Sequence, residues 1–262
     1  MEILHILNGD ATFQGFQETG LEGDALVWRE VLSEGPLEAD IRSASFWKAR
    51  SEWICAGFNE TPEKYRESVL NSLARLSDPW DEINLWFEFD LHCQSNLLGV
   101  MNYLKQNTDL SLPPIYLICP SEFPGVTNFR GMGELNGDQL EYLYDNIRVQ
   151  LNEIDFVVAA EAWQLFTQKN GGMLEQYLNT NTLWGDLKCL RPALEADLKR
   201  LQLNSNGLNY IEQKLLDFYN AGAKSQGEIY AQFWATEKIY GMGDLEIAIY
   251  LNKLRENGFI GY

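Results

Sequence analysis

The chain has 262 residues, of which 45% are hydrophobic and 22% are charged, and its formal net charge is −18. This balance is typical of a globular protein with a well-filled core and argues against intrinsic disorder. The excess of acidic side chains repels phosphate backbones and anionic membrane surfaces, which disfavours nucleic acids and membranes as partners.

Short apolar runs alternate with helical patterns through the first half of the chain. Strands are predicted over residues 3–7, 25–28, 83–89 and 115–118, and helices over residues 11–18, 45–57, 62–76 and 91–106. Apolar strands that alternate with helices are typical of a parallel sheet that helices cover on both faces. We therefore predict a three-layer α/β domain with a mostly parallel, Rossmann- or flavodoxin-like sheet over residues 1–150.

Residues 120–137 interrupt this alternation with two prolines and four glycines. The glycines give the segment hinge freedom, and it leaves the fourth strand at the same edge as the other strand ends. We therefore predict that this loop covers the edge as a lid and that Arg130 faces an anionic ligand.

The rest of the chain is expected to be helical. Helices are predicted over residues 139–147, 152–168, 173–178, 187–203, 209–219, 226–234 and 245–256. Residues 151–203 would form a helical connector. In residues 204–262, the turn at 220–224 and the capping box of Ser225 and Glu228 predict a winged-helix-like module. Because this module carries 5 Lys+Arg against 7 Asp+Glu, we expect it to contact a protein or to have a packing role rather than to bind DNA.

Polar residues follow the predicted strands at the point where each strand ends. They are Asn8, Gly9, Asp10, Arg29, Glu30, Glu34, Glu88, Asp90, His92 and Gln94. Because the carboxyl ends of parallel strands lie along one edge of a sheet, we expect these residues to line one crevice. Gly9, at the start of the first helix, also offers backbone N–H groups to a phosphate. The crevice is predicted to bind a small polar ligand that carries a phosphate or a nucleotide.

Two chemistries are open at this edge. If the first and third strands are neighbours, Asp10, Glu88 and Asp90 converge and would hold Mg²⁺ or Mn²⁺, since hard cations prefer oxygen ligands. The protein would then be a metal-assisted hydrolase or transferase. Alternatively, crowding raises the pKa of one carboxyl group, so that one of the acidic residues, Glu30 included, acts with His92 as a general acid or base.

Simpler structural roles are also open for several of these residues. Asp10 and Asp90 each stand before a predicted helix, where an N-cap is a sufficient explanation. Arg29 and Glu30 would form a structural ion pair. His5 lies inside an apolar strand, as a core histidine or as a ligand-binding residue.

Several familiar catalytic and nucleotide-binding signatures are absent. The sequence contains no G-x-x-x-x-G-K-[ST] loop, no G-x-G-x-x-G after a strand and no G-x-S-x-G. Whether the protein is an enzyme therefore stays open. The alternative function is a regulatory protein that senses a ligand and acts through its C-terminal helices on a protein, with DNA as the less favoured target. A third interpretation is an interaction module that has no small-molecule site.

The four cysteines lie far apart and form no C-x-x-C pair, and the chain has two histidines. A structural zinc site and a disulfide scaffold are therefore not expected, and Cys93 and Cys119 are interpreted as small apolar residues. No apolar run approaches the ~18 residues of a membrane span. The N-terminus also lacks the basic stretch and apolar core of a signal peptide, so we expect a cytoplasmic protein.

Three segments together resemble a bacterial family known as domain of unknown function 1835. They are residues 5–10 (HILNGD), 27–36 (VWREVLSEGP) and 86–91 (WFEFDL). Residues 206–244 are similar to the helical domain that accompanies this family. Family members often carry His where this chain has Phe89 and Asp where it has Cys93, a departure that weakens a metal site dependent on those two positions. The resemblance implies where the site lies and implies no particular activity.

Overall fold

The computed structural model describes residues 1–107, 112–223 and 225–261. Its centre is a five-stranded sheet with the order β2-β1-β3-β4-β5. The strands are β1 (Ile3–Asn8), β2 (Asp24–Trp28), β3 (Glu82–Trp86), β4 (Ile115–Ile118) and β5 (Val149–Gln150). The first four are parallel and β5 is antiparallel to β4. The predicted α/β fold with a mostly parallel sheet is therefore confirmed, with β5 as an unpredicted addition.

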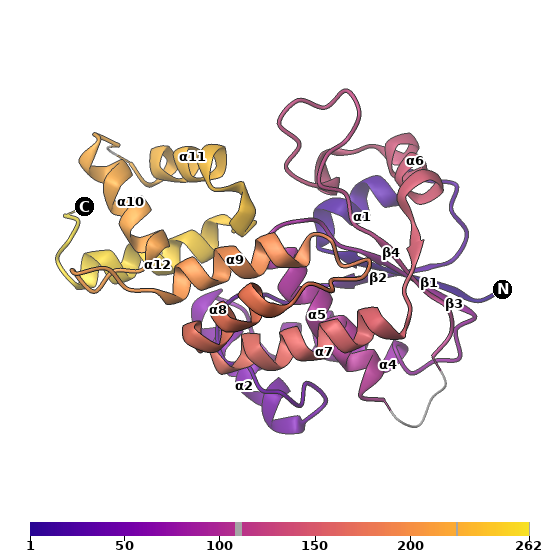
Figure 1. The fold of residues 1–262 in the computed structure, drawn as a ribbon. Helices are drawn as coiled ribbons and strands as arrows, with labels where there is room; N and C mark the ends of the chain where they lie inside the picture. The colour runs from indigo at the N-terminus through magenta and orange to yellow at the C-terminus, as the bar shows by residue number, and fades with distance from the viewer. Residues whose placement is uncertain (108–111, 224, 262) are drawn as a thin grey trace.

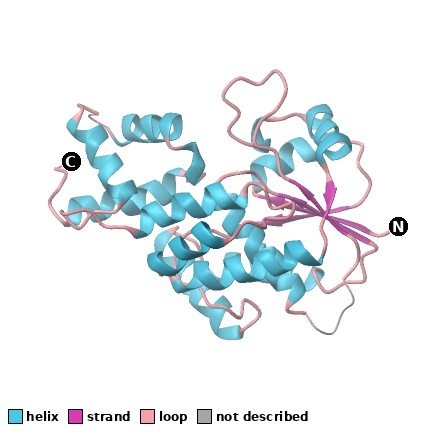
Figure 2. Cartoon of the chain, viewed as in Figure 1, coloured by secondary structure: helices cyan, strands magenta, loops and turns pink. Residues whose placement is uncertain are grey.

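Helices cover both faces of the sheet (Figures 1 and 2). One face carries α1 (Asp10–Phe16) and α6 (Gly137–Ile147), and the other carries α5 (Leu91–Lys105) and α7 (Glu153–Gln168). Successive side chains of a strand point to opposite faces. Leu7 accordingly packs in the core beneath α1 and α6, while Ile6 packs in the larger core with α5 and α7.

The remaining elements follow the predicted pattern closely, with one interruption. They are α2 (Ala44–Gly57), α3 (Pro62–Tyr65), the π-helical turn η1 (Arg66–Leu70), α4 (Asn71–Arg75), the 3₁₀ turn η2 (Met132–Glu134), α8 (Gly171–Thr180), α9 (Leu190–Leu201), α10 (Tyr210–Asn220), α11 (Gln226–Thr236), the 3₁₀ turn η3 (Lys238–Tyr240) and α12 (Asp244–Glu256). The single helix predicted over 62–76 is thus broken by the π-helical turn. Strand β3 ends at Trp86, so residues 87–90 form a connection to α5 instead of continuing the strand.

The C-terminal region is helical, as Figure 1 shows at the end of the molecule away from the N-terminus. Within the described part of residues 204–262 there are helices and no strand. A β-ribbon wing is not seen there, so the winged-helix prediction is not confirmed. Lys224, in the turn on which that prediction drew, lies outside the described residues. Among the described helices, none is both long enough and apolar enough to cross a membrane.

A buried ionic network joins the C-terminal helices to the α/β domain. Arg200 of α9 lies 2.5 Å from Glu34, which follows β2, and 2.6 Å from Asp197. The hydroxyl group of Tyr250, on α12, donates to Glu34 over 2.7 Å. Glu34 was predicted to bind a ligand, but in the structure its carboxylate is occupied by these contacts. The network therefore holds α9 and α12 against the carboxyl end of the sheet.

We expect the substitution Arg200→Met to destabilise the protein strongly. It removes the cation shared by Glu34 and Asp197 and leaves two carboxylates buried without it, a change that costs about 3–5 kcal/mol when a buried pair is broken. The free energy of unfolding in urea measures the loss. Arg191→Met is the matched control, because Arg191 forms an exposed pair with Glu195 and such pairs contribute up to about 1 kcal/mol. Equal losses for the two variants would contradict the structural role of the network.

Candidate functional site

Two carboxylates and a thiol meet where β3 leads into α5. Asp90 is the N-cap of α5 and accepts a hydrogen bond from the backbone N–H of Cys93 over 2.8 Å. The Cys93 thiol lies 2.8 Å from Glu88, whose other carboxylate oxygen accepts from the N–H of Met132 over 2.6 Å. One potential ligand atom from each of Glu88, Asp90 and Cys93 lies within 4.8 Å of the others. We call these three residues the acid–thiol cluster; the cap predicted for Asp90 is confirmed.

Burial governs the protonation of this cluster. Glu88 and Asp90 are 6% and 4% exposed. Loss of water, together with the neighbouring charge of Asp90, raises the pKa of Glu88 to about 7. Burial also raises the pKa of Asp90 and that of the Cys93 thiol. The cluster therefore retains protons at a pH where an exposed carboxyl group would have lost them.

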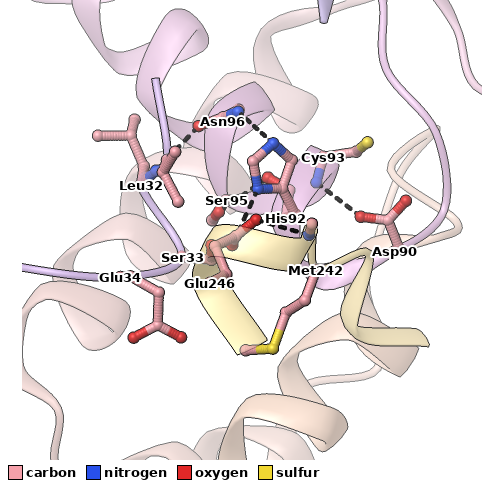
Figure 3. Close-up of polar contacts among 12 residues, drawn as sticks. Leu32, Ser33, Glu34, Asp90, His92, Cys93, Ser95, Asn96, Met242 and Glu246 are labelled. Carbon is pink, nitrogen blue, oxygen red and sulfur yellow. Dashed lines mark hydrogen bonds and ion pairs between the residues drawn. The ribbon is translucent and has the colours of Figure 1, made fainter. Parts of the chain in front are cut away.

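His92 connects the cluster to the C-terminal helices (Figure 3). Its Nδ1 lies 3.4 Å from a carboxylate oxygen of Glu246, on α12. Glu246 also accepts hydrogen bonds from the Ser33 hydroxyl group and from the N–H of Gly243. Burial lowers the pKa of His92, but the carboxylates of Glu246, Asp90 and Glu88 outweigh this effect and raise it to about 9. His92 is consequently an imidazolium ion at neutral pH, with Glu246 as its counter-ion.

Amide side chains support the cluster from the sheet and from α5. Asn8, at the end of β1, donates to the sulfur of Cys93 over 3.0 Å and accepts from Asn96 over 2.8 Å. Gln94 donates to the backbone carbonyl of Glu88 over 2.6 Å, and its own amide oxygen is buried without a hydrogen-bond partner. The predicted site residues Asn8, Glu88, Asp90, His92 and Gln94 are thus brought together.

Asp10 and Arg29 pair with each other and do not belong to the acid–thiol cluster. Asp10 is the first residue of α1 rather than its cap, and its carboxylate pairs with Arg29 over 2.7 Å at the surface. The sequence suggested Asp10 as a third metal ligand beside Glu88 and Asp90. In the structure the third residue of this group is Cys93 instead. The N–H of Gly9 donates to backbone carbonyls of the sheet edge, so it is not free to bind a phosphate.

Glu30 and His5 are also buried, and structural contacts occupy both side chains. Glu30 is fully enclosed with Arg50 at 2.6 Å and also accepts from the hydroxyl group of Tyr65, so the predicted Arg29–Glu30 ion pair does not form. His5 is buried in the sheet. One of its ring nitrogens lies 3.2 Å from the carbonyl of Glu22, and the other accepts from the indole N–H of Trp86. The interpretation of His5 as a core histidine is confirmed, and both nitrogens are already engaged.

A cavity of about 500 Å³ lies over the acid–thiol cluster. Its lining comes from α1, the loop after β4 and the segment from α11 to α12, namely Ala11, Arg130, Gly131, Gly133, Glu134, Phe233, Trp234, Glu237, Lys238, Gly241, Met242 and Gly243. Gly131 lies against Glu88, where a Cβ atom would be 2.8 Å from the carboxylate. Gly241, whose φ is 62°, lies so close to Asp90 that a Cβ atom would be 2.0 Å from its oxygen. Two glycines therefore separate the cavity from the buried carboxylates.

The loop of residues 120–137 packs at the strand ends, where the sequence placed it. The N–H of Met132 binds Glu88, and the Lys238 side chain donates to the carbonyl of Asn128 over 3.1 Å. Arg130 lines the cavity, and its predicted contact with an anionic ligand stays a prediction. Sequence reasoning did not find Glu246, Gly241 or Lys238, because they belong to the C-terminal region and reach the site only through the tertiary fold.

Comparison with models of known protein families gives no match for this chain. A search of curated proteins gives no match either. The resemblance to the family of domain 1835 stays a prediction.

The two histidines of the chain should titrate at opposite ends of the neutral range. Burial lowers the pKa of His5 below its ordinary value of 6.5, whereas that of His92 is raised to about 9. In protein treated with a chelator, NMR of the imidazole rings at pH 7.5 should show one neutral and one charged ring. His92→Asn, which removes the charged ring, assigns the two signals.

The free energy of unfolding should depend on pH through the charge of His92. Because folding raises the pKa of His92, its contribution is complete below pH 6.5 and is lost as the pH rises through about 9. Glu246→Gln should reduce this loss and shift the titration of His92 downward. Two rings that both titrate near 6.5 would contradict the assigned contact.

Proposed function

We propose that the protein binds a small anion that carries a flat ring, of the size of a nucleotide, in the cavity beyond the strand ends. The observation that carries the proposal is the composition of the cavity wall, which combines Arg130 and Lys238 with the indole ring of Trp234. A volume of about 500 Å³ lies within the ordinary range of small-molecule pockets, roughly 300–1,000 Å³.

The position of the cavity in the fold supports this proposal. In the order β2-β1-β3-β4, strands β2 and β3 lie on opposite sides of β1. The chain therefore runs from β1 to one side, to form β2, and then crosses to the other side of β1 to form β3. This is the flavodoxin-like order, and open α/β sheets bind their ligands beyond the strand ends at such a switch point. The cluster after β3 and the first residues of α1 lie on the two sides of that point.

The side chains of the wall suit both parts of such a ligand. The lining also holds Glu134, which pairs with Arg130, and Glu237, which pairs with Lys214, so an anion would bind at the cations of Arg130 and Lys238. Arg130 is 60% exposed and pairs with Glu134, a contact that an anion can replace. Trp234 is 36% exposed and its N–H is held by the carbonyl of Met242, which fixes the indole ring for stacking.

Binding is proposed ahead of catalysis because the acid–thiol cluster is closed off from the cavity. Glu88 and Asp90 would act as a general acid or base on a ligand only if the backbone at Gly131 and Gly241 moved aside. A hydrolase or transferase activity therefore requires an opening of this floor. Such an activity would require that the ligand first binds in the cavity.

A role in ligand sensing is the alternative function, and one observation favours it. The segment from α11 to α12 supplies more than half of the residues around the cavity. The same segment contains Glu246, which binds His92 beside the cluster. A ligand in the cavity would therefore act directly on the seating of the C-terminal helices, which is the requirement for passing a signal to a protein partner.

Isothermal titration calorimetry with inorganic pyrophosphate, AMP, ATP and GTP tests the proposal. We expect binding of at least one nucleotide and at least about tenfold weaker binding by Arg130→Ala, equivalent to about 1.4 kcal/mol. Arg191→Ala should bind like the wild type, because Arg191 pairs with a glutamate four residues later, as Arg130 does, but lies outside the cavity lining.

The substitution Trp234→Ala tests the contribution of the ligand's ring to the affinity separately from that of its phosphates. It should weaken the binding of nucleotides while leaving any binding of pyrophosphate unchanged, because only the nucleotide has a ring to stack. An absence of binding across the set, or equal affinities for Arg130→Ala and Arg191→Ala, would overturn the proposal.

A further inference from the structure

We propose that Glu88, Asp90 and Cys93 form a site for a divalent cation of the zinc class. Nothing in this proposal depends on the ligand of the cavity. The donor set is mixed, with two carboxylate oxygens and one sulfur within 4.8 Å of one another. Ligands bonded to one tetrahedral ion at about 2.0–2.3 Å lie about 3–4 Å apart, so the three side chains need only a small contraction.

The charge around the cluster leaves room for a cation. Three carboxyl groups, those of Glu88, Asp90 and Glu246, are buried in this region, and the imidazole ring of His92 lies 3.4 Å from Glu246. The arginine and lysine ion pairs of the described chain go to other carboxylates, and none of them includes Glu88 or Asp90. Ionised carboxylates without a counter-charge are costly to bury, and a bound divalent ion can replace the protons that otherwise neutralise these groups.

An orphaned amide oxygen gives independent support. Gln94 is 1% exposed, and its Oε1 is buried with no hydrogen-bond partner. The nitrogen of the same amide group is bound to the backbone carbonyl of Glu88 over 2.6 Å. The amide group of Gln94 thus lies against the backbone of Glu88 and keeps an oxygen that no hydrogen bond uses. Three protein ligands with a further position for water or an amide oxygen are typical of zinc sites that are not purely structural.

Asn8 provides the outer support that metal ligands usually have. Its amide group donates to the sulfur of Cys93 over 3.0 Å, and Asn96 holds Asn8 in place over 2.8 Å. A donor directed at the sulfur stabilises the thiolate form that a metal binds. The Cys93 ligand is thus oriented before any ion arrives.

The sulfur ligand decides the class of the ion. Mg²⁺ and Mn²⁺ were expected from a set of oxygen ligands, but the structure has Cys93 in the place assigned to Asp10. Thiolates favour zinc and similar borderline ions over hard cations such as Mg²⁺. The spacing of the cysteines argued against a zinc site built on C-x-x-C pairs, and this site instead combines one cysteine with two carboxylates.

Titration with Co²⁺, a spectroscopic substitute for zinc, tests the site in the full-length protein after treatment with a chelator. We expect a thiolate-to-cobalt charge-transfer band in the near ultraviolet that saturates at one ion per chain and disappears when Zn²⁺ is added. Cys93→Ser should abolish the band. Cys55→Ser should retain it, because Cys55 is a partly buried cysteine of α2 outside the cluster.

A second variant keeps the test decisive if Cys93→Ser fails to fold. Asp90→Asn removes a charged ligand while preserving the cap of α5, since Asn caps about as well as Asp. Its circular dichroism should match that of the wild type, and its affinity for Co²⁺ should fall at least tenfold. The absence of a charge-transfer band in the wild type, a band that persists in Cys93→Ser, or wild-type affinity in folded Asp90→Asn would each overturn the proposal.

Discussion

The burial of two carboxylates, Glu88 and Asp90, is the constraint on which this end of the molecule depends. Water cannot solvate these groups, so the protein must supply their partners. Asp90 begins α5 by capping it, and Glu88 binds the backbone of Met132, which holds the loop after β4 over the strand ends. Glu246, with smaller contributions from Asp90 and Glu88, raises the pKa of His92 beside them. The local structure of the site is therefore set by the need to satisfy two acids.

The C-terminal helices complete this arrangement and are part of the site. Glu246 of α12 pairs with His92, while Gly241 fits against Asp90 at a distance that a larger residue would not permit. The network of Glu34 with Arg200 and Tyr250 holds the same helices in place. The cavity lies between these helices, the loop after β4 and the first turn of α1. Ligand binding and the seating of the C-terminal region are consequently linked by shared contacts.

The sequence predicted the sheet because each parallel strand carries its own apolar pattern, and it located the site because polar residues follow those strands. It placed the end of β3 too late, since Phe87 is buried although it lies beyond the strand, and hydrophobicity alone does not mark such an end. It also assigned Asp10 to the cluster, where Cys93 lies instead. The contact of His92 with Glu246 spans 154 residues, so no local pattern contains it.

The central claim of this account is that a cation balances the buried acids of the acid–thiol cluster. Anomalous X-ray diffraction, measured on both sides of the zinc absorption edge from crystals grown with Zn²⁺, tests it most directly. The account predicts an anomalous peak bounded by the side chains of Glu88, Asp90 and Cys93. A map in which these three side chains bind only one another, with no zinc peak among them, would contradict it.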